Sequence, residues 1–208
     1  ANLSGTNLTG ASLSGANLIG TDLSDSILRN ASLDSINLTE ANLNGAVLTH
    51  AYLAKSDLSM VDLNGVEIDQ AHLGEANLSG AGLSNANLTN TYLENATLSN
   101  TNLSGANLRR AILDRADLEG ADLSGADLRN ASMRETNLMK AALDGADLRG
   151  ARMVKARLGL SNLQGARLDG ADMRGIRGKY AVWREANWWD ATMDESLSKS
   201  LSKKWPRD

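Results

Sequence analysis

Large apolar residues recur at every fifth position along most of this chain. From Leu3 to Met173 there are 35 such central positions, and 31 of them are Leu. The residue two places earlier is small, and it is Ala in 24 of the 35 repeats. The resulting pattern, A-[N/D]-L-x-[G/N], keeps its register over residues 1–175. Self-similarity at a fixed period predicts a repeat architecture.

A period of five residues fits neither an α-helix nor an unbroken β-strand. On a helix, successive central residues would advance by about 500° and spiral around the whole circumference. On a strand, an odd period would place alternate central residues on opposite faces. We therefore expect a bend in every repeat, with the small residue and the Leu inward and the residue between them outward. Gly and Asn, which tolerate positive φ, are frequent at the last place, where the corner turns.

Four such bends close a coil of twenty residues, and coils stack at the spacing of paired strands, about 4.8 Å. The pattern thus predicts an all-β solenoid, a quadrilateral β-helix of about nine to ten coils with a C-terminal α-helical cap. One coil buries too little apolar surface to fold alone, so we expect folding to be cooperative along the rod.

Three runs of sequence resemble the pentapeptide-repeat proteins: A-N-L-S-G at residues 1–5, A-N-L-R-R at 106–110 and A-D-L-E-G-A-D-L-S-G-A-D-L-R-N at 116–130. The resemblance extends to about residue 193. It implies a right-handed β-helix and a bacterial, often cyanobacterial, non-enzymatic scaffold for protein–protein interaction. The alternative it implies is a DNA-mimicking inhibitor or protector of DNA gyrase or topoisomerase. Gyrase-binding members tend to carry Phe at the central position, whereas this chain has no Phe.

The repeat degenerates near the C-terminus while its frame persists. Trp183 and Trp188 replace Leu at central places, as expected of a wider last coil. Thr192 and Glu195 have the spacing of a helix capping box. The expected segments are the repeat coil at 1–175, a degenerate Trp-containing coil at 176–192, and a cap helix with its tail at 193–208.

The helix expected over residues 193–205 is amphipathic, with apolar residues at every fourth position. We expect it to close the end of the coil; a dimerising helix is the alternative. At the other end, Ala1 lies in mid-repeat, which predicts either a removed preceding segment or end-to-end packing in a homodimer.

Outward residues twenty positions apart are expected to form columns. One column contains Tyr52, His72, Tyr92 and Ile112 in succession. We expect either a stack that stabilises a bare sheet or a contact patch for another protein, because Tyr is enriched at interfaces.

A second pair of columns is charged. Arg109, Arg129 and Arg149 follow their central residues, and Asp127 and Asp147 precede two of them. We expect a solvated face in which carboxylates offset the repulsion between arginines. A phosphate-binding strip is the alternative.

Charge is divided along the chain, whose formal net charge is −4. Residues 1–104 carry only two basic groups, Arg29 and Lys55, and ten acidic ones, whereas residues 105–208 carry 19 basic and 15 acidic groups. The basic half lacks the interleaved aromatic residues of a single-strand binder, so we expect no direct binding of nucleic acid.

Composition removes several classes of function. The chain has no Cys and two His, which predicts no disulfide, no metal site and no cofactor. Ser and Asp are abundant, but no His converges on them, and we expect no catalytic residues. No apolar run approaches the ~20 residues of a membrane span. The absence of Cys and of a leader favours the cytoplasm, while the start at Ala1 fits a processed lumenal, periplasmic or secreted form.

Overall fold

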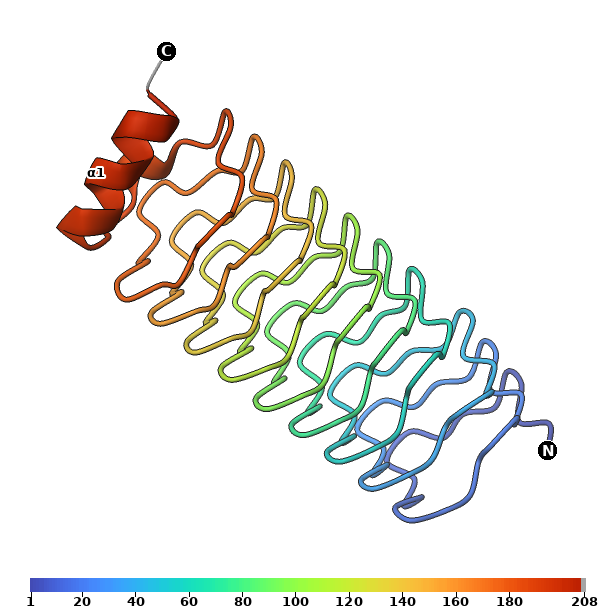
Figure 1. The fold of residues 1–208 in the computed structure, drawn as a ribbon. Helices are drawn as coiled ribbons and strands as arrows, with labels where there is room; N and C mark the ends of the chain where they lie inside the picture. The colour runs from blue at the N-terminus through green and yellow to red at the C-terminus, as the bar shows by residue number, and fades with distance from the viewer. Residues whose placement is uncertain (207–208) are drawn as a thin grey trace.

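A two-residue turn recurs every five residues from Ser4 to Glu185. The computed structural model, which describes residues 1–206, therefore bends once in each repeat, as the sequence predicts. The bends wind the chain into a rod of stacked coils, with the N-terminus at one end and the only α-helix of the described residues near the other (Figure 1).

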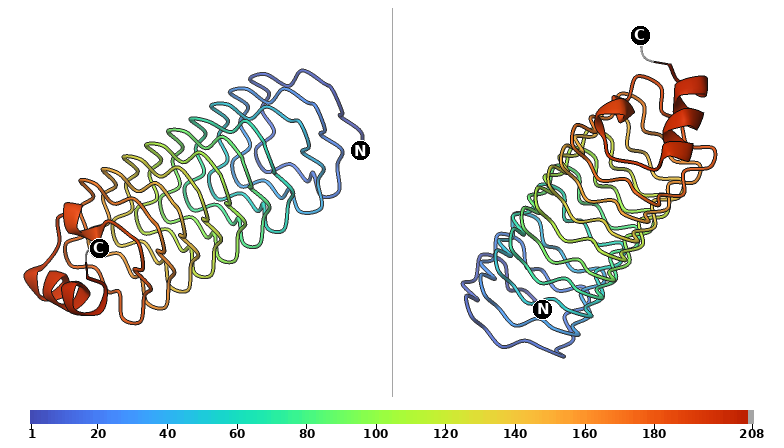
Figure 2. Two further views of the ribbon diagram at one scale, coloured as in Figure 1. Left: turned by 90° about the horizontal axis from the view of Figure 1, so that it is seen from above. Right: turned by 90° about the vertical axis from the view of Figure 1, so that its left-hand side faces the viewer.

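Successive coils are joined by parallel backbone pairing between residues twenty positions apart. The pairing runs from Asn2 with Asp22 to Asp172 with Thr192. Each pairing is a single bridge, and no run within residues 1–206 is long enough to count as a strand. Only the outward residue of each repeat forms a bridge, because the turns on either side of it interrupt the backbone pairing. Two further views show the coils stacked one after another along the rod (Figure 2).

Leucine and small side chains fill the interior of the coil. The central residues are buried from Leu18 to Met173, while Leu3, Leu8 and Leu13 at the N-terminal end are half buried. At four of the places where the small residue is Thr, its hydroxyl donates to a backbone carbonyl; that of Thr101 donates to Leu78 at 2.7 Å. These bonds pair buried hydroxyl groups, whereas the hydroxyl of Ser26 at another small place is buried without a partner.

Every fifth residue from Gly5 to Glu185 has a φ between 55° and 71°. Gly is only one of the residues found there: Met60 and Leu160 adopt the same left-handed conformation. The backbone pairing of neighbouring coils thus imposes the turn on side chains that disfavour it. At Gly105 space matters as well, because an added Cβ would lie 2.6 Å from the side-chain oxygen of Asn85.

The C-terminal end is closed by tryptophan and a short helix. A 3-10 helix, η1, spans Trp188–Asp190, and α1 spans Glu195–Lys204. Trp183 and Trp188 are buried there, at 2% and 3% exposure. The central place at Gly178 has no side chain, and the Trp183 ring lies beside it, 3.5 Å from where a Cβ would stand.

Helix α1 packs its apolar face against the end of the core. Leu201 is buried, and Leu197 and Trp205 are half buried against the same cluster. The position agrees with the predicted cap, although α1 is shorter than the helix expected over residues 193–205. The predicted tail ends in residues 207–208, which lie outside the described residues.

The predicted capping box is wrong. Thr192 pairs with Asp172 as part of the coil, and the residue that precedes α1 is Asp194. The Asp194 carboxylate accepts the backbone N–H of Gly175 at 2.8 Å and makes no capping bond to α1. The Asp194 side chain is therefore bonded to the rod, while only its backbone carbonyl bonds to the first turn of α1, accepting the N–H of Ser198 at 3.1 Å.

The strained corners predict a stabilising substitution. Leu160 has a φ of 62° and is 55% exposed, so it loses little packing when shortened. Leu160→Asn should raise the free energy of unfolding by about 0.5–1 kcal/mol, because Asn tolerates the left-handed conformation. Leu160→Ala is the control, since Ala keeps the strain. Urea denaturation measures both, and equal effects of Asn and Ala would contradict the assignment of strain.

Candidate functional site

Three aromatic rings stack on the outside of the rod. The ring centroids of Tyr52 and His72 lie 4.9 Å apart, those of His72 and Tyr92 4.6 Å apart, and the planes differ by 9° and 3°. Ile112 is the next residue of the same column. Tyr52 and Tyr92 remain 45% and 39% exposed. The structure thus brings together these four predicted residues, here called the aromatic ladder.

The ladder belongs to one continuous column of bridged outward residues, here called the tyrosine wall. Ser32 precedes Tyr52 on it, and Ile112 follows Tyr92. Because the stacked rings cover one another's faces, they present ring edges, tyrosine hydroxyls and imidazole nitrogens to solvent. Such a surface suits contact with protein side chains better than the stacking of a flat ligand. The full wall consists of Ser12, Ser32, Tyr52, His72, Tyr92, Ile112, Ser132, Arg152, Asp172 and Thr192.

A second column, here called the shoulder, lies two residues after the tyrosine wall in each repeat. Asp34 accepts the backbone N–H of Ala54 at 2.9 Å, and Asp114 accepts that of Arg134 at 3.0 Å, so the shoulder keeps the twenty-residue register. It is small beside Tyr52 and His72, acidic beside Tyr92 and Ile112, and largely basic nearer the C-terminus. Its residues are Ser14, Asp34, Ala54, Gly74, Glu94, Asp114, Arg134, Val154 and Arg174.

The predicted charged columns form internal clamps. The Arg129 guanidinium donates to both carboxylate oxygens of Asp127, at 2.8 and 2.5 Å. Arg149 holds Asp147 in the same way, at 2.8 and 2.6 Å. Arg109 follows an Asn instead of an Asp and forms no salt bridge within residues 1–206. Two of the three guanidinium groups are thus already occupied, which favours the solvated face over a phosphate-binding strip.

These clamps shift the protonation of the carboxylates. Hydrogen bonds from Arg129 hold the pKa of Asp127 below its ordinary value, and those from Arg149 do the same for Asp147. Partial burial opposes both shifts and is outweighed. The aspartates are therefore charged at neutral pH, as ligands of the arginines.

The lowered pKa values predict acid-dependent stability. The clamps contribute fully above the pKa of Asp in the unfolded chain, about 3.9, and are lost as the pH falls through the lower folded values. Asp127→Asn/Asp147→Asn should therefore unfold at lower denaturant than the parent at pH 7, and the difference should vanish as the pH drops well below 4.

Arg109→Gln is the matched control from the same column, because it breaks no clamp. Urea midpoints measured from neutral to strongly acidic pH test the prediction. A difference between the double variant and the parent that is the same at every pH would contradict it.

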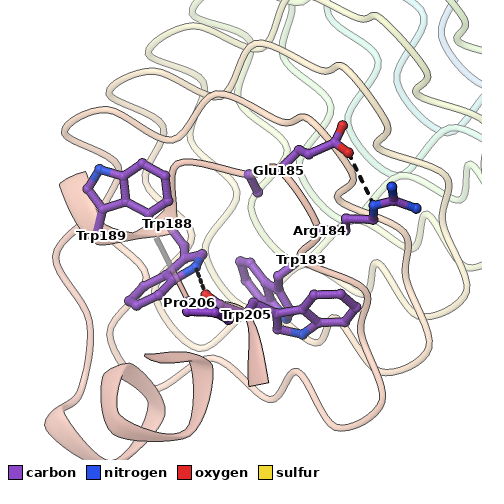
Figure 3. A pocket seen from close by; sticks show the side chains of 8 residues that line it. Trp183, Arg184, Glu185, Trp188, Trp189, Trp205 and Pro206 are labelled. Atoms are coloured by element: carbon purple, nitrogen blue, oxygen red, sulfur yellow. Dashed lines mark hydrogen bonds and ion pairs between the residues drawn. The ribbon is translucent and has the colours of Figure 1, made fainter. Parts of the chain in front are cut away.

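A hollow of about 440 Å³ lies at the C-terminal end, beside the last coil and the residues after α1. Figure 3 shows tryptophan rings around it and the indole N–H of Trp188 donating to the carbonyl of Trp205, at 3.3 Å. Arg184 and Glu185 form an ion pair at its edge, at 3.1 Å. The lining residues are Trp183, Arg184, Glu185, Ala186, Trp188, Trp189, Trp205 and Pro206.

Sequence reasoning missed a basic hollow on the tyrosine wall. The hollow measures about 510 Å³ and is lined by Arg134, Arg152, Val154, Asp172 and Arg174. Arg174 clamps Asp172 at 2.8 and 2.6 Å, whereas Arg134 and Arg152 form no salt bridge within the described part of the chain. The hollow could have been predicted from the sequence, because the twenty-residue columns bring these arginines together from three separate repeats.

Within residues 1–206, no group of three or more His, Cys, Asp or Glu side chains is arranged to hold a metal ion. None of the helices described is long and apolar enough to cross a membrane.

The geometry defines a β-solenoid made of five-residue repeats. A family model described as pentapeptide repeats matches in eight copies between residues 1 and 177. The chain therefore belongs to the pentapeptide-repeat family, and its fold is the right-handed β-helix of that family. A search of the curated proteins found no match.

Two solved structures illustrate the similarity. HetL, a pentapeptide-repeat protein involved in heterocyst differentiation regulation in the cyanobacterium Nostoc, is 33% identical, with 93% of this chain and 92% of HetL covered and a TM-score of 0.50. Full-length QnrB1, a plasmid-mediated fluoroquinolone resistance protein, is 14% identical, with 98% and 96% covered and a TM-score of 0.58. At that identity, the likeness to QnrB1 concerns the fold alone.

Proposed function

We propose that this chain is a non-enzymatic scaffold whose aromatic ladder binds another protein. The observation that carries the proposal is the stack of Tyr52, His72 and Tyr92, whose two tyrosines are exposed, because a rigid coil holds these large side chains in place before binding. Rings that are already ordered lose little conformational entropy in a complex. In this proposal the clamped aspartates and arginines of the charged columns form a solvated face that stabilises the rod and takes no part in binding.

We further propose that the coil is quadrilateral. Its support is the combination of a turn every five residues with pairing every twenty, which gives four walls in each coil. The segments are then a repeat coil at 1–175, a Trp-containing last coil at 176–192 and a cap at 193–208, about nine to ten coils in all at the spacing of paired strands.

The alternative is a DNA-mimicking inhibitor or protector of gyrase or topoisomerase. Mimicry of a duplex needs a long acidic exterior, and the acidic residues 1–104 are diluted with Ser, Thr and Asn on their outward positions. The ladder therefore supports protein binding better than duplex mimicry. Loss of gyrase supercoiling at micromolar protein would favour the alternative.

Removal of the ladder tests the proposal. Tyr52→Ser/Tyr92→Ser leaves the buried core intact and should abolish capture of the partner protein in a pull-down from the native cell extract. Tyr180→Ser is the matched control, because Tyr180 is 65% exposed but lies outside the ladder. An unchanged set of captured proteins in the double variant would remove the ladder as a binding site.

A further inference from the structure

The positive charge of the last coils is concentrated on two neighbouring columns, the tyrosine wall and the next bridged column, Asn137–Arg157–Arg177. The stretches that hold these columns, 131–140, 151–160 and 171–180, carry eight basic and two acidic residues. The intervening stretches, 141–150 and 161–170, carry two basic and three acidic residues. A chain with a net charge of −4 therefore presents one strongly positive surface.

Six exposed cations surround the corner between these two columns, here called the basic corner: Arg134, Arg152, Lys155, Arg157, Arg174 and Arg177. Three of them line the basic hollow, and the other three line a second hollow of about 490 Å³ on the other side of the corner. Gly175 contributes no side chain to the second hollow, where a Cβ would lie 3.3 Å from the Cγ atom of Lys155.

Five of these six cations have no carboxylate of their own. Among the described residues only Arg174 of the six forms a salt bridge, with Asp172. Arg157 donates to the sulfur of Met139 at 2.8 Å, and a thioether is a weak acceptor. Arg157 and Arg177 are bridged neighbours, so their like charges repel until an anion binds between them.

The carboxylates at the edge of the basic corner are engaged within the rod. Glu135 pairs with Arg115 at 3.6 Å, and the Asp194 carboxylate accepts the backbone N–H of Gly175 at 2.8 Å. Asp172 is clamped as described above. The five remaining cations are therefore left to an anionic partner.

The extent of the basic corner favours a short anion. Its three coils span two coil spacings, about 10 Å along the rod. In the preceding coil the same side carries Asp114, Asp117 and Glu119, which would repel a polyanion that continued along the rod. An extended peptide of about three to six residues, at about 3.3 Å per residue, fits this extent, whereas a nucleic-acid duplex runs beyond it.

We propose that the basic corner is a second docking site, which binds a short acidic segment of a protein partner. Guanidinium groups suit this ligand because their paired N–H groups match the two oxygens of an Asp or Glu carboxylate. The site needs no contact with the aromatic ladder, so it goes beyond the function proposed above.

A fluorescein-labelled hexaglutamate peptide is the probe, and fluorescence anisotropy measures its binding to the full chain, with labelled hexaglutamine as the control. Exposed ion pairs are individually weak, so we expect a dissociation constant of about 0.1–1 mM at about 100 mM salt. Binding should weaken several-fold when the salt is raised to about 500 mM, because screening increases. Hexaglutamine should not bind.

Arg152→Glu/Arg157→Glu removes one unpaired cation from each hollow and should raise the dissociation constant at least tenfold, because it sets like charges against the peptide. Arg109→Glu/Arg167→Glu is the matched control, since both arginines are exposed, form no salt bridge within residues 1–206 and lie outside the basic corner. This variant has the same net charge and should change the dissociation constant less than about twofold, because distant charges are screened at about 100 mM salt. Thermal unfolding of each variant checks that the fold is kept.

Equal losses in the two arginine variants would overturn the inference, because net charge would then control binding. Absence of hexaglutamate binding up to about 1 mM protein, or equal binding of hexaglutamine, would also overturn it. A short DNA duplex or phosphatidylserine vesicles that Arg152 and Arg157 hold more tightly than the peptide would contradict the choice of an acidic protein segment. Tyr52→Ser/Tyr92→Ser should bind the peptide as the parent does, so the pull-down decides the proposed function separately.

Discussion

The structure depends on one constraint, the pairing of each outward residue with the residue twenty positions along the chain. The backbone of Asp122 donates to the carbonyl of Thr101 at 2.9 Å, and Leu103 donates to the carbonyl of Asp122 at 2.7 Å, so each bridge is bonded on both sides. The Leu between bridges is buried by the coils above and below it. Neither the pairing nor the burial is available to one coil alone, which makes the rod cooperative.

The same register turns a repetitive sequence into a patterned surface. Any two outward residues twenty apart become neighbours, so a ladder of rings needs only one suitable residue in each coil. Tyr52, His72 and Tyr92 show the result, with nearly parallel planes set by the backbone. Clamps such as Arg129 on Asp127 need no neighbouring coil, because the two residues flank one Leu in a single repeat. Binding surfaces therefore depend on the register, whereas the clamps depend on local sequence.

Most of the fold was predictable from the sequence because its determinants are periodic. The inward Leu, the outward bridging residue and the column of aromatic residues all follow from the spacing of five. The start of α1 was not predictable, because Asp194 bonds to Gly175, nineteen residues earlier, and only the folded coil brings them together. The left-handed corners at Met60 and Leu160 likewise arise from pairing between coils, against the local preference of these residues.

The twenty-residue register is tested most directly by disulfide cross-linking, since the chain contains no Cys of its own. Asn77 and Thr97 are bridged, and the spacing of paired strands, about 4.8 Å, lies within the range that a disulfide spans. Asn77→Cys/Thr97→Cys should oxidise readily in the folded protein, whereas Asn77→Cys/Asn102→Cys should remain reduced because Asn102 belongs to another column. A reduced first pair, or equal oxidation of both pairs, would contradict the account.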